Sequence, residues 1–91
     1  MPNRLGLALV ANKLAVGTTL ALKAIRNGSA KLVLLASDAS EATIKNITDK
    51  AKFYNVPVVM KYDTLTLSKP IGRKNIKVIS ILDEGFKKMY L

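Results

Sequence analysis

The sequence predicts a single α/β domain, a three-layer α/β/α sandwich in which helices cover both faces of a mixed four-stranded sheet. Segments with the apolar spacing of helices alternate with short apolar segments typical of strands. One of these short segments, residues 32–36, is apolar throughout, as expected for a strand covered on both faces. With 91 residues, 49% of them hydrophobic, the chain suits one small core, so residues 1–91 are expected to form one domain.

The first helix is expected at residues 4–15, where Pro2 and Asn3 can start it. A very short extended segment and a turn follow at 15–17. Apolar residues recur along this helix at helical spacing, which predicts one buried stripe. The stripe consists of Leu7, Val10, Ala11 and Leu14.

The second helix is expected at residues 18–27, and Gly28 follows it where the end of a helix favours a residue with positive φ. Thr19, Lys23 and Arg26 share one face of this helix. Two cations on one helix face are typical of an ordinary solvent-exposed surface, so this face alone does not indicate a binding site. The apolar face carries Ala21, Leu22 and Ile25.

The second half of the chain continues the alternation of strands and helices. After a buried strand at 30–36, Ser40 is expected to cap a third helix at 41–54. The order is completed by a short strand at 56–60, one or two helical turns at 64–69, a last strand at 76–82 and a short C-terminal helix. The buried stripe of the third helix is expected to be Ile44, Ile47, Ala51 and Tyr54, while Asn55 and Pro70 end helical segments and Asp83 caps the last helix.

The chain is strongly basic, with 15 Lys and Arg against 6 Asp and Glu, a net charge of +9 and a pI near 10.1. A small domain with this charge is expected to attract a polyanion, with nucleic acid as the leading candidate and an anionic membrane surface as the weaker one. The sequence contains no cysteine and no histidine. We therefore expect no disulfide, no metal site, no cofactor and no catalytic residues.

The beginning of the chain, Arg4 followed by the apolar run at 5–11, faintly resembles a signal peptide, but secretion is not expected. The apolar run at 5–11 is short, and Lys13 follows it closely. No stretch approaches the roughly 20 apolar residues of a membrane-spanning helix. We expect a cytoplasmic protein without a membrane partner.

Basic residues gather in three regions that are separated along the sequence. In a three-layer fold, the start of the second helix and the late loop at 71–75 could meet at one end of the sheet. The sequence alone does not show that they meet. The cations of the three regions are Lys23 and Arg26, then Lys31, then Arg73 and Lys74.

Two motifs in the first half of the chain resemble those of a known family. Residues 17–23 read Gly-x-x-x-x-x-Lys, and residues 26–40 read Arg-x-Gly-x-Ala-Lys-Leu-Val-x-x-Ala-x-Asp-Ala-Ser. This pattern resembles the kink-turn RNA-binding superfamily of ribosomal proteins, which includes archaeal L7Ae and eukaryal L30e, and it is closest to the bacterial YlxQ type. The resemblance implies a non-catalytic, monomeric protein that binds structured RNA, either ribosomal or kink-turn-like, in association with the ribosome.

The resemblance also implies a binding surface. In the family, the second helix begins Gly-x-Asn-Glu-x-x-Lys and its N-terminus lies against phosphate, while the Asn and Glu read guanine edges. A later loop, after Leu-Gly-x-Ala-x-Gly, packs on bases flipped out of the kink. Gly17, Thr18 and Lys23 match the family by position and type. The residues at the corresponding RNA-binding positions, together with the neighbouring cations, are Gly17, Thr18, Thr19, Leu20, Lys23, Arg26, Lys31, Ile71, Gly72, Arg73, Lys74 and Asn75.

The chain departs from the family pattern at Thr19 and Leu20, which replace Asn and Glu, and at Ser68 and Pro70, which replace Gly and Ala. Leucine cannot accept a hydrogen bond from a guanine amino group, so RNA binding without strict kink-turn reading is expected. The alternative is a protein-interaction module in which Leu20 belongs to an apolar contact patch. A lipid-binding role is disfavoured because no helix pairs a broad Trp/Phe face with a lysine face.

Overall fold

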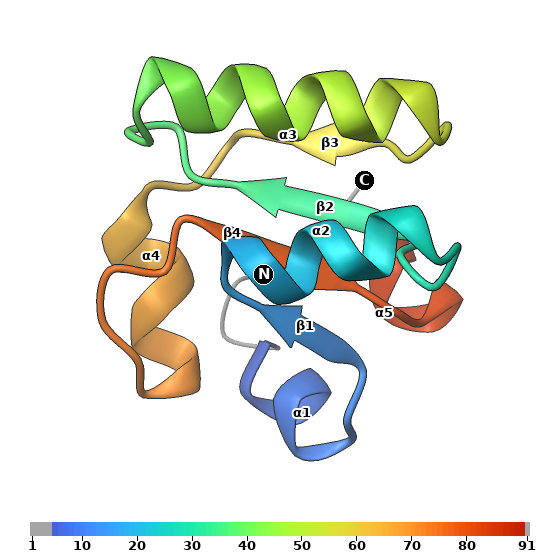
Figure 1. Cartoon of the computed structure of the whole chain (residues 1–91). Coiled ribbons are helices and arrows are strands. Elements are labelled where there is room, and N and C mark those ends of the chain that lie inside the picture. The colour runs from blue at the N-terminus through green and yellow to red at the C-terminus, as the bar shows by residue number, and fades with distance from the viewer. Residues whose placement is uncertain (1–4, 91) are drawn as a thin grey trace.

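The computed structural model describes residues 5–90, and its elements follow the predicted order. Figure 1 shows the arrangement. The helices are α1 (Leu5–Val10), α2 (Thr18–Arg26), α3 (Glu41–Phe53), α4 (Thr64–Ser68) and α5 (Glu84–Lys88), with a 3₁₀ turn, η2, at Lys69–Ile71. The strands are β1 (Leu14–Val16), β2 (Leu32–Leu35), β3 (Val58–Val59) and β4 (Val78–Ile81).

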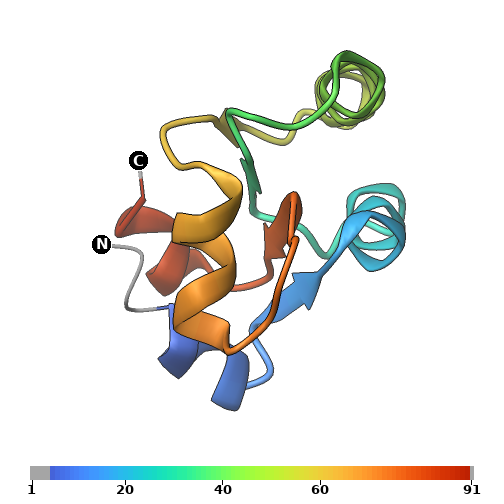
Figure 2. The ribbon, with the colours of Figure 1, turned by 90° about the vertical axis from the view of Figure 1, so that its left-hand side faces the viewer.

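The four strands form one mixed sheet in the order β1-β4-β2-β3. β4 pairs antiparallel with both β1 and β2, whereas β2 and β3 run parallel. Helices α2 and α3 cover one face of the sheet, and α1, α4 and α5 lie on the other (Figure 2). The predicted three-layer architecture is therefore confirmed.

The alternating side chains of β2 divide the core between the two faces. Leu32, Leu34 and Ala36 are buried in the cluster under α1, α4 and α5. Val33 and Leu35 are buried in the cluster under α2 and α3. A strand covered on both faces has no polar side, which explains its continuous apolar sequence.

The first helix is shorter than predicted, and the buried stripe assigned to it is wrong. α1 ends at Val10, and Asn12 takes a left-handed conformation with a φ of 59°. Leu14 lies in β1 opposite Ile81, because β4 needs a backbone partner on that edge. Leu5 and Ala8 are the buried residues of α1, while Leu7 and Val10 are 61% and 85% exposed and Ala11 is exposed. The predicted start at residues 2–4 lies outside the described residues.

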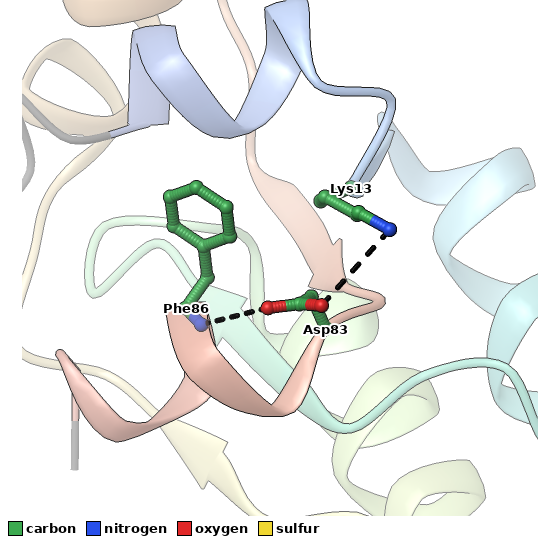
Figure 3. A network of polar contacts seen from close by, with 3 residues as sticks. All are labelled: Lys13, Asp83 and Phe86. Carbon is green, nitrogen blue, oxygen red and sulfur yellow. Dashed lines mark hydrogen bonds and ion pairs between the residues drawn. The ribbon is translucent and has the colours of Figure 1, made fainter.

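The predicted N-terminal caps of α3 and α5 are confirmed. Ser40 Oγ accepts a hydrogen bond from the Thr43 N–H at 3.2 Å and begins α3. Asp83 accepts from the Phe86 N–H at 3.2 Å and begins α5. Figure 3 shows that Asp83 also faces Lys13, with 4.0 Å between Nζ and Oδ1, which links α5 to the segment before β1.

Two helical segments end at residues other than those predicted. Ile47 and Ala51 of α3 are buried and Ile44 is half-buried, but Tyr54 lies beyond the helix and is 41% exposed. Pro70 does not end the helical segment that begins at Thr64. The chain continues through η2 and stops at Gly72, since proline fits the first turn of a helical segment.

Gly28 has the predicted positive φ, at 82°. Gly28→Ala is expected to lower the free energy of unfolding by about 1 kcal/mol, because Cβ penalises a left-handed backbone. No atom lies within 4 Å of the added Cβ, so the cost would come from the backbone conformation rather than from a clash. Urea denaturation measures it. Gly28→Asn should recover part of the loss, and an alanine variant as stable as the parent would contradict the assignment.

Candidate nucleic-acid interface

The N-terminus of α2 is joined directly to the first residue of β4. Gly17 precedes the helix with a φ of 93°, and its N–H donates to the Val78 carbonyl over 2.9 Å. Glycine suits this position because other residues rarely adopt a positive φ. The bond brings the beginning of α2 next to the segment that enters β4.

The first turn of α2 is open to solvent. Within the described residues, the N–H groups of Thr18, Thr19 and Leu20 have no hydrogen-bond partner, because Gly17 offers no side chain to cap them. All three side chains are exposed, Leu20 at 55%. Free N–H groups and the positive end of the helix dipole favour an anion at this point.

Packing against the sheet fixes the position of α2. Ala21, Ala24 and Ile25 are buried against the sheet. The buried Ser80 hydroxyl on β4 donates to the Ala21 carbonyl over 3.1 Å. The open first turn is therefore presented by a fixed helix.

The loop that precedes β4 is shaped by Ser68. Its buried hydroxyl donates to the Thr64 carbonyl over 2.6 Å and accepts from the Ile76 N–H over 2.9 Å. Its carbonyl accepts from the Arg73 N–H over 3.1 Å. Gly72 and Asn75 take left-handed conformations with φ of 65° and 58°. The loop is thus held at both ends, and it exposes Arg73, Lys74 and Asn75.

A polar network joins this loop to the turn after β2. Asp38 Oδ1 accepts from the Thr64 hydroxyl at 2.6 Å and from the Thr64 N–H at 2.9 Å. Lys77 Nζ donates to the same hydroxyl oxygen over 2.8 Å. A hollow of about 670 Å³ opens beside the network, and the loop cations Arg73 and Lys74 contribute to its lining.

A family model described as the ribosomal protein L7Ae/L30e/S12e/Gadd45 family matches residues 1–90. The chain belongs to this family. The resemblance read from the motifs at 17–23 and 26–40 is therefore confirmed.

The relatives extend this finding. The chain is 44% identical over 82 residues to the RNA-binding protein YlxQ of Bacillus subtilis (strain 168), covering 90% of this chain and 82% of that one. It is 42% identical over 86 residues to the RNA-binding protein YlxQ of Enterococcus faecium, covering 94% and 82%.

Solved structures share the fold. A protein with unknown function from Bacillus halodurans C superposes with a TM-score of 0.91 at 36% identity, over 98% of this chain and 90% of that chain. The Giardia lamblia 15.5kD RNA binding protein superposes with a TM-score of 0.82 over 98% and 77%, and its 21% identity supports the fold alone.

In this L7Ae-family chain, the residues predicted from the motifs divide between two ends of the sheet. Gly17, Thr18, Thr19 and Leu20 lie at the same end as the loop at 72–75, the end that faces the viewer in Figure 2. Arg26 ends α2, and the Lys31 N–H donates to Ile81, the last residue of β4, so both lie at the opposite end. Lys23 is exposed between the two ends.

Ile71 differs from the expectation for the loop. Its side chain is 7% exposed and belongs to the core under α1, α4 and α5, so it is not available for packing on a base. Ser68, Asp38, Thr64 and Lys77 were not among the predicted site residues. Lys77 lies inside the segment at 76–82 that the sequence predicts as a strand, so no local pattern marks it as part of a network. The contact between Asp38 and Thr64 spans 26 residues of sequence.

The pKa of Asp38 lies below its ordinary value, chiefly because the Thr64 hydroxyl and then the Thr64 N–H donate to its carboxylate. A carboxylate whose pKa is lower in the folded state stabilises the fold at pH values above its unfolded pKa of about 3.9. This stabilisation is lost as the pH falls through the lower pKa of the folded state. We therefore expect Asp38→Asn to be less stable than the parent near neutral pH, with the difference closing as the solution is acidified below about pH 4.

Urea midpoints of the parent and Asp38→Asn across this pH range measure the effect. Asp49→Asn is the control, because Asp49 is an exposed carboxylate of α3. A difference between the parent and Asp38→Asn that stays constant at all pH values would contradict the interpretation.

Within the described residues, no helix is both long enough and apolar enough to cross a membrane. No group of three or more His, Cys, Asp or Glu that could hold a metal ion occurs among them.

Proposed function

We propose that this chain is a non-catalytic protein that binds structured RNA through one end of its sheet. The surface consists of the first turn of α2 and the loop at 72–77, which we call the α2–β4 surface. The observation that carries the proposal is the hydrogen bond from the Gly17 N–H to the Val78 carbonyl. It joins an uncapped helix N-terminus to a loop with adjacent cations. The names of the YlxQ relatives support RNA as the polyanion.

The two parts of the surface have different tasks in this proposal. The free N–H groups at the start of α2 bind phosphate oxygens, and Lys23 adds a charge one turn further along the same helix. Arg73 and Lys74 neutralise phosphates of a neighbouring strand, and the Asp38–Thr64–Lys77 network holds their loop in position. Bases that are flipped out of a kink would pack on this loop.

The RNA is proposed to be ribosomal or kink-turn-like, with the protein acting in the cytoplasm as a monomer in association with the ribosome. Family membership supports a ribosomal context. Leu20 presents no hydrogen-bond acceptor at the position where the family reads guanine. The preferred RNA is therefore a structure held more through its backbone than through base edges.

The salt dependence of RNA binding tests the proposal. Lys74→Glu and Lys23→Glu should each weaken binding to a kink-turn RNA and reduce the slope of log affinity against log salt by roughly one unit. Filter binding across a salt series measures both quantities. Lys88→Glu is the matched control, because Lys88 is an exposed cation on α5, on the other face of the sheet. An equal effect of all three substitutions would indicate binding by net charge alone and would contradict a localised surface.

A protein-interaction role is the second candidate, and the exposure of Leu20 favours it. A leucine that is 55% exposed beside two threonines offers an apolar contact at the head of α2. Binding through such a contact would hardly change between low and moderate salt, whereas phosphate binding would weaken steeply. The same salt series therefore separates the two functions.

A further inference from the structure

An exposed aromatic pair marks the C-terminal end of α3. Phe53 is 80% exposed and Tyr54 41%, and their rings meet edge to face with 4.9 Å between centroids and an interplanar angle of 77°. The 13 residues of α3 span about 20 Å, so this pair lies that far from the start of the helix, which is at the same end of the sheet as the α2–β4 surface. The core of the domain does not use these rings.

The backbone at this helix end is held rigidly. The Val56 N–H donates to the Ala51 carbonyl over 2.8 Å, and the Asn55 N–H donates to the Lys52 carbonyl over 3.2 Å. Together with the φ of 60° at Asn55, this is a Schellman motif. Val56 then packs against the core under α2 and α3. The aromatic pair is therefore presented on a fixed backbone, which reduces the entropy lost when a ligand binds.

A hollow of about 380 Å³ adjoins the pair, and its lining combines several kinds of chemistry. Asn46, Asp49, Lys50 and Phe53 recur at helical spacing on one face of α3 and line it with Tyr54. The rings offer flat apolar surfaces. Asp49 offers a carboxylate acceptor, Asn46 an amide, and Lys50 a cation.

We propose that this hollow is a subsite for an unpaired nucleobase that carries an exocyclic amino group. The base would stack on the Phe53 ring and donate its amino hydrogens to Asp49. Lys50 would neutralise an adjoining phosphate. An RNA segment fits better than an apolar protein partner because the cation Lys50 lines the hollow with the rings and the chain carries a net charge of +9. This subsite goes beyond the proposed function, and it does not depend on the α2–β4 surface.

The first test asks whether binding of an oligonucleotide requires an aromatic ring at position 53. Binding of fluorescein-labelled oligocytidylate to the full chain is measured by anisotropy at fixed salt. Phe53→Leu keeps an apolar side chain but removes the ring, and it should weaken binding by about fivefold or more. Phe53→Tyr keeps the ring and should bind like the parent. Val10→Ala, which truncates a residue that is 85% exposed on α1, is the control and should have no effect.

Base selection is the second test. Cytosine has an amino group where uracil has a carbonyl oxygen, so the parent should bind oligocytidylate more tightly than oligouridylate of equal length. Asp49→Ala should abolish this preference. Lys74→Glu, on the α2–β4 surface, should leave the ratio of the two affinities unchanged, so a failure of that surface would not be mistaken for a failure of the subsite.

Three outcomes would overturn the proposal. The first is that Phe53→Leu binds as tightly as Phe53→Tyr, which would indicate an apolar contact suited to a protein. The second is that Val10→Ala weakens binding as much as Phe53→Leu. The third is that the parent does not discriminate between the two oligonucleotides.

Discussion

Ile47→Ala is expected to lower the free energy of unfolding by about 2–5 kcal/mol. The side chain of Ile47 is 0% exposed and lies in the core cluster between the sheet and the helices α2 and α3. Truncation removes buried methyl and methylene groups and leaves a cavity that the rigid sheet fills only partly. Chemical denaturation, with the midpoint and slope compared between variant and parent, measures the loss.

Leu7→Ala is the matched control for this prediction. The apolar spacing of the first helix places Leu7 in a buried stripe, but the structure exposes 61% of its side chain. Its truncation should therefore change stability by no more than about 0.5 kcal/mol. A loss at Leu7 equal to that at Ile47 would contradict the exposure of the Leu7 side chain.

The contrast between Ile47 and Leu7 shows what apolar spacing can predict. In α3, Ile44, Ile47 and Ala51 form one apolar stripe, and Phe53 at the end of the helix is the large apolar residue outside it, so the spacing identifies one buried face. The first helix is apolar on several sides, and both Leu5–Ala8 and Leu7–Val10 satisfy helical spacing. The open edge of β4 decides between them, because it recruits residues 14–16 as a strand and so shortens the helix. That requirement is not local and cannot be seen in the sequence around α1.

Local signals predict the caps and turns well. Ser40, Gly28 and Asp83 each act within about one helical turn, and each takes the predicted role. Pro70 is the exception, because a proline is compatible with the beginning of a helical turn as well as with its end.

The candidate site depends on contacts between distant segments. The motifs place Gly17 and Lys74 in exposed regions, but their proximity follows from the position of β4 beside β1. The same topology moves Arg26 and Lys31 to the far end of the sheet, which no motif shows. The Asp38–Thr64–Lys77 network joins three segments through side chains, and its residues are individually unremarkable in the sequence.

Under the proposed function, Leu20→Glu is expected to favour a kink-turn RNA over a plain duplex by about 1–3 kcal/mol more than the parent does. The substitution places a carboxylate acceptor at the position where the family resemblance implies a contact with a guanine amino group. Leu20 is 55% exposed in the first turn of α2, where a negative charge is also favourable to the helix dipole, so stability should be retained. Affinities for both RNAs at two salt concentrations measure the preference.

Leu20→Glu also removes one net positive charge, which should weaken its binding to duplex RNA. This electrostatic effect must be separated from the proposed gain of a hydrogen bond to a guanine edge. Val10→Glu makes the same charge change at an exposed residue of α1, which lies outside the α2–β4 surface. Leu20→Gln supplies an acceptor without a charge. If the acceptor matters, Leu20→Glu and Leu20→Gln should both raise the ratio of kink-turn to duplex affinity, while Val10→Glu should leave that ratio unchanged. If all three variants leave the ratio at the parent's value, the start of α2 does not read guanine edges, and the chain binds RNA through its charge alone.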